Sequence, residues 1–256
     1  MTEVNRKEML AGLFLSKFDT TGLSELGFSS WNEAYNTLAL AVHGRPLSVK
    51  GYRDEFDPFF DNPRKGWHKR PAHQNRLDMM DEYCDLSLEA FAELVRTQFA
   101  VDGHELDAEI GNAVVAAGVK QGEDTPFAKR MVTGLAAENY FADHYREHVK
   151  FADCLIERTT ALGCGFDFKL MPPKEKFLGV EVKGMAKFKG QVMLTEKEFK
   201  MAEYLKKRFY LYVVSGFSSN APRPIIVDDP LSAGITFEEK TIESKQKVWV
   251  AKMAAA

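Results

Sequence analysis

Apolar residues recur every three or four positions through the first 120 residues, which is the spacing that one face of an α-helix requires. The first helix is predicted over residues 5–18 and the second over 30–42. A short third helix, capped by Ser48, is expected to end before Pro58. Further helices are predicted over 74–84, from 87 onward and over 107–119.

The pattern changes after Phe151 to short runs of β-branched and aromatic residues bounded by glycine and proline, which is typical of strands. Before this point, Thr125 and Pro126 form a helix-start signal. That helix is predicted to reach about Val149, with an interruption near Gly134. Five strands are then predicted in the segments CLIERTT, FDFKLM, FLGVEVKGM, FYLYVVSGF and PIIVDD.

One more helix is predicted between the third and fourth strands. Thr195 and Glu198 stand three residues apart at the start of TEKEFKMAEYLKK, as in a capping box. The resulting order is helix, three strands, helix and two strands. The sequence therefore predicts an α/β domain over residues 124–256 behind an all-helical domain over residues 1–123.

The composition is that of an ordinary globular protein, with 256 residues of which 45% are hydrophobic and 28% charged. No apolar run approaches the roughly 20 residues that span a bilayer, and the chain begins with no signal-peptide pattern. Its three cysteines, Cys84, Cys154 and Cys164, are far apart in the sequence. These features predict a cytoplasmic protein with no membrane association.

The net charge of −3 hides a strong segregation of charge along the chain. Residues 44–76 hold eight Lys and Arg against four Asp and Glu, and residues 169–208 hold eleven against five. The intervening residues 77–124 hold two against twelve. The two basic segments favour contact with a polyanion such as nucleic acid, although solvated faces of amphipathic elements give the same pattern.

Three charged residues, Asp167, Glu181 and Lys183, stand inside the predicted apolar strands. Burying an unpaired charge is costly, so these residues are expected to compensate one another. Residues two apart in a strand share a face, and a hairpin can bring Asp167 beside Glu181 and Lys183. Two carboxylates suit Mg²⁺ or Mn²⁺, and a lysine can stabilise a phosphate under attack. The pattern favours phosphodiester hydrolysis; the alternative is a cross-strand salt bridge on a half-exposed sheet.

The Glu-x-Lys triplet alone carries little information, because the chain contains it four times, at Glu181, Glu198, Glu238 and Glu243. The Glu198 copy falls in a predicted helix, where residues two apart do not share a face. Only the Glu181 copy has apolar strands on both sides and an aspartate upstream at hairpin distance. The interpretation as a site therefore depends on Asp167 as much as on the triplet.

From about Gly134 to Pro230 the chain resembles the PD-(D/E)xK nuclease superfamily, whose fold is restriction-endonuclease-like. The matching motifs, in order, are GLAAENYF, GFDF, VEVKG, TEKEF and FYLYVV, followed by a late Asp-Pro. The similarity is strongest to an uncharacterised nuclease-like branch found in restriction and helicase-associated proteins. It implies a mixed sheet flanked by helices behind the helical domain.

The same resemblance implies roles for individual residues. Asp167 and Glu181 match metal ligands, and Lys183 matches the catalytic lysine. Glu138 matches an acidic helix residue that completes the metal site, although a glutamate on a helix is more commonly a surface residue. The sequence departs from the pattern at Phe166, where the superfamily motif has proline.

A second candidate metal site lies near the end of the predicted helix before the strands. His144 and His148 are four residues apart, and Asp143 and Glu147 stand next to them. Zinc needs a third protein ligand, which Cys154 or Cys164 could supply. The commoner interpretation of such a run is a solvated helix face.

A third candidate region is the loop over residues 61–76, in which basic and aromatic residues alternate. Such a mixture suits DNA, because cations bind phosphates while a few side chains read bases. The alternative is a connecting loop that tucks Trp67 into the core. The expected DNA contacts are Arg64, Lys65, Trp67, His68, Lys69, Arg70 and Arg76, with Lys187, Lys189 and Gln191 lining the substrate groove.

Together these patterns predict a magnesium-dependent double-stranded DNA endonuclease of restriction type, whose helical domain contributes DNA recognition. Cutting both strands with one active site per chain favours a homodimer, whose two-fold symmetry would match a palindromic site. Such an enzyme is expected to act beside a cognate DNA methyltransferase. The alternatives are a nuclease acting on modified or branched DNA or on RNA, and a non-catalytic DNA-binding module.

Overall fold

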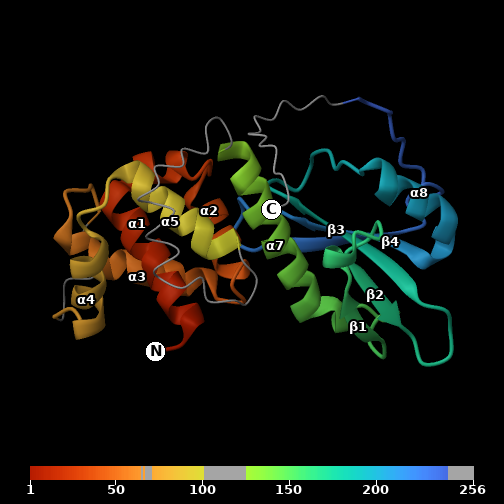
Figure 1. The fold of residues 1–256 in the computed structure, drawn as a ribbon, viewed down its shortest axis with the longest axis horizontal. Helices are drawn as coiled ribbons and strands as arrows, with labels where there is room; N and C mark the ends of the chain where they lie inside the picture. Colours follow the sequence, from red (N-terminus) through yellow and green to blue (C-terminus); the bar gives the residue numbers. More distant parts are fainter. Residues whose placement is uncertain (65, 67–70, 101–124, 242–256) are drawn as a thin grey trace, which may run out of the picture.

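The computed structural model describes residues 1–64, 66, 71–100 and 125–241. It has a helical N-terminal part and a β-sheet in the C-terminal part, with the long helix α7 (Thr125–His144) standing between them (Figure 1). No helix within these residues is long and apolar enough to cross a membrane. The N-terminal helices are α1 (Glu3–Glu25), α2 (Trp31–Leu40), α3 (Pro46–Phe56), α4 (Gln74–Tyr83) and α5 (Leu88–Ala100), with a 3-10 turn η1 (Asp57–Phe59) after α3.

The sheet has five strands in the order β1-β2-β3-β4-β5. All neighbouring strands are antiparallel except β3 and β4, which are parallel because helix α8 (Glu196–Leu205) carries the chain back across the sheet. The sheet is therefore mixed, and the α/β prediction for this part of the chain is confirmed. The elements are β1 (Leu155–Arg158), β2 (Phe168–Met171), β3 (Leu178–Met185), α8 (Glu196–Leu205), β4 (Phe209–Ser215) and β5 (Arg223–Asp228), with 3-10 turns η2 (Tyr145–Glu147), η3 (Thr160–Leu162) and η4 (Lys206–Arg208).

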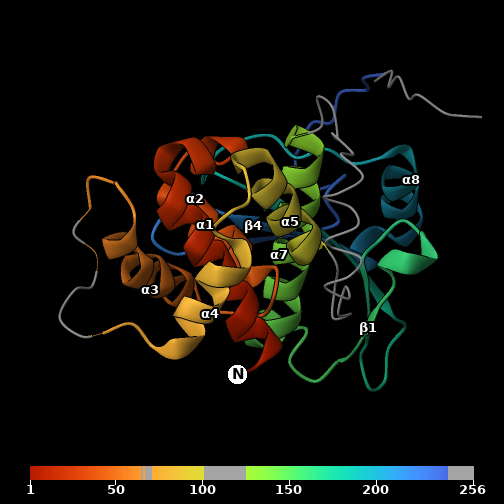
Figure 2. The same cartoon turned by 60° about the vertical axis from the view of Figure 1, so that its left-hand side comes forward.

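Helices α7 and α8 pack against strand β3 through two glycines. A Cβ atom added to Gly184 would lie 2.8 Å from Cγ2 of Thr133 in α7, and one added to Gly179 would lie 2.8 Å from Cδ1 of Leu205 in α8. Because alternate residues of a strand point to opposite faces, α7 and α8 cover opposite faces of the sheet. In Figure 2, α7 separates the N-terminal helices from α8. The odd-numbered positions of β3 face α8.

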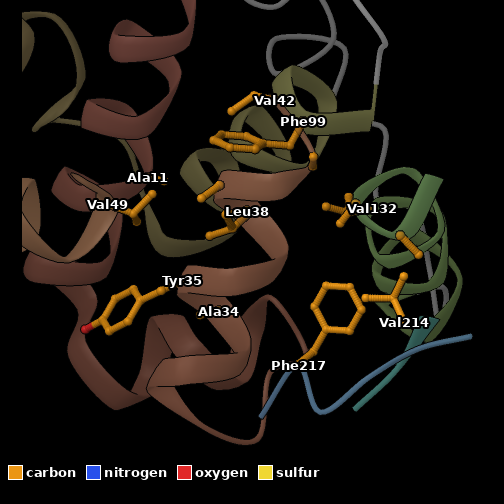
Figure 3. Packing of buried hydrophobic residues seen from close by; sticks show 14 of the residues in the cluster. Ala11, Ala34, Tyr35, Leu38, Val42, Val49, Phe99, Val132, Val214 and Phe217 are labelled. Atoms are coloured by element: carbon orange, nitrogen blue, oxygen red, sulfur yellow. The ribbon is translucent and has the colours of Figure 1, made fainter. Parts of the chain in front are cut away.

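The hydrophobic core is continuous from the N-terminal helices to the sheet. Phe141 of α7 is fully buried, and its ring centroid lies 4.9 Å from that of Phe168 and 4.8 Å from that of Tyr212. Figure 3 shows Val132 of α7 between side chains of the N-terminal helices and Val214 of β4, all within one buried cluster. The proposed boundary between domains, after residue 123, falls outside the described residues.

Some predicted helix ends agree with the structure and others do not. The helix predicted to reach about Val149 ends at His144. Ser30 caps α2 by accepting a hydrogen bond from the Glu33 backbone N–H, as expected. The helix predicted to start at Ser48 begins at Pro46 instead, because proline fixes the backbone angle that suits a first helical position. Gly134 does not interrupt α7. The helix predicted over 107–119 lies outside the described residues.

Candidate functional site

The candidate site begins where strands β2 and β3 pair. Their antiparallel register sets Phe168 opposite Val180, so that Asp167, one residue earlier, lies opposite Glu181. The Asp167 backbone N–H donates to the Val180 carbonyl at 3.0 Å, and the Asp167 carboxylate accepts from the Val182 N–H at 2.9 Å. Side chains directly opposite in an antiparallel pair share a face. The two carboxylates therefore meet on the face of the sheet that α8 covers.

Lys183 joins these carboxylates together with a residue that the sequence interpretation missed. Its ammonium lies 2.5 Å from Oε1 of Glu181 and 2.8 Å from Oε2 of Glu198 in the first turn of α8. In the sequence Glu198 belongs to the capping box, to one Glu-x-Lys copy and to the TEKEF motif, and none of these predicted a role for it in the site. We call Asp167, Glu181, Lys183 and Glu198 the carboxylate–lysine cluster.

Burial and mutual repulsion perturb the charges in this cluster. Glu181 is 3% exposed, and its burial, with the nearby charges of Asp167 and Glu198, raises its pKa to about 8. Burial also raises the pKa of Asp167, against the stabilising effect of the Val182 N–H and Lys183. Burial by itself lowers the pKa of Lys183, but the charges of Glu181 and Glu198 outweigh it and raise that pKa. The ammonium is therefore protonated at neutral pH.

The donor set of the cluster fits a hard divalent cation. Three carboxylates face one ammonium, and a cation between Asp167 and Glu181 would offset the burial that raises both pKa values and the repulsion by Asp167 that further raises the pKa of Glu181. Among the described residues, no group of three or more His, Cys, Asp or Glu side chains is arranged to hold a metal. Mg²⁺ does not require such a group, since it is commonly bound by one or two carboxylates together with waters and substrate phosphates.

Glu138 stands on helix α7, where it contacts Thr160 and Arg158. Its Oε2 is 3.1 Å from the Thr160 hydroxyl, which donates to it, and 3.6 Å from an Arg158 guanidinium nitrogen. Arg158 stacks over the Phe168 ring at 5.2 Å, on the face of the sheet that packs against α7. The structure thus brings Asp167, Glu181 and Lys183 together and places Glu138 with Arg158. A metal-binding role for Glu138 stays a prediction.

The candidate histidine site does not assemble among the described residues. Helix α7 ends at His144, so that His144 and His148 do not lie on one helix face as predicted. The His144 Nδ1 atom lies 2.8 Å from the Tyr140 carbonyl, whereas the His148 ring packs on Phe151 at 4.5 Å. The two imidazoles therefore have separate partners. Cys154 and Cys164 are both free thiols.

In the basic loop the structure shows what holds Arg64 and Arg76. Arg64 donates two hydrogen bonds of 2.9 Å to the Asp57 carboxylate and also pairs with Asp19. Arg76 donates to Glu55 at 2.7 Å. Arg64 therefore fastens the loop to the helical part, whereas Arg76 lies in α4 and joins it to α3. A DNA phosphate would compete with these ion pairs. The other predicted contacts of this loop, Lys65, Trp67, His68, Lys69 and Arg70, lie outside the described residues.

The segment between β3 and α8 carries the remaining predicted DNA contacts. Lys187, Lys189 and Gln191 are all exposed. This segment joins the strand of Lys183 to the helix of Glu198. Their contact with DNA stays a prediction.

A model of a known protein family matches this part of the chain. A family model described as "Protein NO VEIN, C-terminal" matches residues 137–227. The matched range contains the whole carboxylate–lysine cluster, as well as Glu138 and Arg158, and nearly coincides with the segment that resembles PD-(D/E)xK nucleases. A search of curated proteins and a search of solved structures found no significant match.

Proposed function

We propose that this protein is a magnesium-dependent nuclease that hydrolyses phosphodiester bonds of double-stranded DNA as an endonuclease of restriction type. The observation that carries the proposal is the position of Asp167 opposite Glu181, with the Lys183 ammonium 2.5 Å from Glu181. Two acidic groups and one cationic group on one face of a sheet suit a reaction in which negative charge builds up on a phosphate.

The residues of the cluster would have different roles in this reaction. Asp167 and Glu181 would hold Mg²⁺, or Mn²⁺, leaving its other positions to water and phosphate oxygens. When bound, the cation supplies Lewis-acid activation of the scissile phosphate. Lys183 holds a proton and a positive charge close to the same position, where it can orient water or stabilise the phosphate oxygens.

The fold around the cluster supports the proposal. The elements α7, β1, β2, β3, α8 and β4 follow one another in the order on which the nuclease resemblance depends. Lys187 and Lys189 are exposed on the segment between β3 and α8 and would provide cations for a phosphate backbone. We further propose that the protein acts as a homodimer on a palindromic site, in which each chain cuts one strand.

A second candidate function is a non-catalytic DNA-binding module. The observation that favours it is the ion pairing of Lys183 with both Glu181 and Glu198, which is sufficient to compensate a buried lysine without any metal. A related candidate is a nuclease for modified or branched DNA or for RNA, which would use the same cluster.

The test is incubation of the purified protein with unmodified and methylated plasmid, phage DNA, branched DNA and RNA, with and without Mg²⁺. The decisive variant is Lys183→Met. Its matched control is Lys169→Met, because Lys169 also stands in a strand and pairs with a glutamate, Glu157, at 2.9 Å. We expect discrete DNA fragments with Mg²⁺ from the wild type and from the control, and none from Lys183→Met. Intact nucleic acid in every lane, with DNA binding retained, would establish the binding module instead.

A further inference from the structure

Glu198 has two sets of contacts at once. Its Oε2 accepts a hydrogen bond from the Thr195 backbone N–H at 3.0 Å, while the Thr195 hydroxyl accepts from the Glu198 N–H at 3.3 Å, which completes the capping box of α8. The same Oε2 lies 2.8 Å from the Lys183 ammonium. The cap therefore fixes the carboxylate that faces Lys183, and helix packing of Leu205 on Gly179 fixes α8 on the sheet.

The two carboxylates that hold Lys183 differ in what else they can bind. Glu181 faces Asp167 and is a ligand in the proposed function, so a cation would compete with Lys183 for its oxygens. Glu198 belongs to another element and is bonded to the backbone of its own helix. When Glu181 is engaged by a cation, Glu198 is the partner that still compensates the ammonium.

We propose that Glu198 is a positioning residue of the site, which holds the Lys183 ammonium next to the Asp167–Glu181 pair when that pair binds a divalent cation. This inference rests on the proposed function. Without the Glu198 charge, Glu181 is the remaining charged partner of the largely buried Lys183. A cation that binds Glu181 would then have to break this contact. We therefore expect weaker cation binding and a displaced Lys183 ammonium. Mutation of residues that contact the metal ligands, without binding the metal themselves, commonly lowers metal affinity or activity by about 10- to 100-fold.

The chain offers a matched pair of variants for the test. Glu198→Gln removes the charge but keeps a side chain that can complete the capping box. Glu196→Gln, two residues earlier, removes a carboxylate of the same helix turn that is 82% exposed and pairs with Lys200 instead. Each is made in the wild type and in a Lys183→Met background, and Mg²⁺ alone is titrated calorimetrically into the DNA-free protein.

We expect Glu198→Gln to weaken Mg²⁺ binding about tenfold in the wild type and about twofold or less in the Lys183→Met background. Glu196→Gln should change it less than about twofold in either background. In DNA cleavage, Glu198→Gln should lower kcat by about 10- to 100-fold while KM changes by less than about threefold.

Two outcomes overturn the inference in distinguishable ways. Equal Mg²⁺ affinities of Glu198→Gln and Glu196→Gln, or an undiminished effect of Glu198→Gln when Lys183 is methionine, would mean that Glu198 does not act through Lys183. The proposed function would then stand. A wild-type protein that neither binds Mg²⁺ nor cleaves DNA would overturn the proposed function and this inference with it.

Discussion

Replacing Glu181 by glutamine should stabilise the metal-free protein and abolish its nuclease activity. Glu181 is buried against Asp167 and Glu198, and these surroundings raise its pKa from its usual 4.5 to about 8. Glutamine has nearly the same shape as the protonated carboxyl group and carries no charge. We therefore expect the metal-free variant to be more stable than the wild type at neutral pH and inactive as a nuclease.

The magnitude follows from the two pKa values. Below pH 4.5 the carboxyl group is protonated in the folded and unfolded states, and it has no effect on the pH dependence of stability. Between pH 4.5 and about 8 the unfolded state loses this proton while the folded state keeps it, so stability falls by about 1.4 kcal/mol per pH unit. At pH 7 the raised pKa of Glu181 therefore lowers the free energy of unfolding of the wild type by roughly 3 kcal/mol.

The assay is urea unfolding of both proteins between pH 5 and 8 in the presence of a chelator. The stability advantage of Glu181→Gln should be about 1 kcal/mol at pH 5 and grow by roughly 3 kcal/mol by pH 8. Glu157→Gln, which removes an exposed glutamate paired with Lys169, is the control and should change stability by less than about 0.5 kcal/mol at any pH. A constant difference between wild type and Glu181→Gln across this range would refute the argument.

Three further predictions concern the framework of the site. Phe141→Ala should lower the free energy of unfolding by about 3–5 kcal/mol in urea, because Phe141 fills the junction of α7 with the sheet; a loss below 1 kcal/mol would contradict this packing. Arg64→Met should cost about 3 kcal/mol, because it leaves Asp57, which is 1% exposed, without its bidentate partner; unchanged thermal stability with weakened DNA binding would instead identify Arg64 as a DNA contact. Thr195→Ala should cost about 1 kcal/mol by removing the cap of α8, whereas Thr195→Ser should be nearly neutral; equal melting temperatures of the two variants would count against the cap.

The positions of the strands and of α8 were predicted well, because they depend on residues close together in the sequence. The short β-branched and aromatic runs bounded by glycine and proline located the strands, and the pairing of Thr195 with Glu198 located the start of α8. The face shared by Glu181 and Lys183 followed from strand geometry alone. The meeting of Asp167 with Glu181 needed only the assumption that β2 and β3 form a hairpin, and their register confirms it.

What the sequence did not reveal depends on tertiary packing. The role of Glu198 appears only once α8 lies over β3, because Lys183 and Glu198 are brought together by the packing of those elements. The same holds for Arg64, whose partner Asp19 is distant in sequence. The predicted shared face of His144 and His148 failed because α7 ends at His144.

The central claim is that Asp167 and Glu181 serve phosphodiester cleavage, and it is tested most directly by Asp167→Asn. The asparagine keeps an oxygen that can accept the Val182 N–H, so the fold should be preserved. The measurement is the rate of plasmid cleavage with Mg²⁺, normalised by DNA affinity in the same buffer. We expect unchanged DNA affinity and a cleavage rate at least about a hundredfold lower than that of the wild type. Cleavage at the wild-type rate by Asp167→Asn would contradict the central claim.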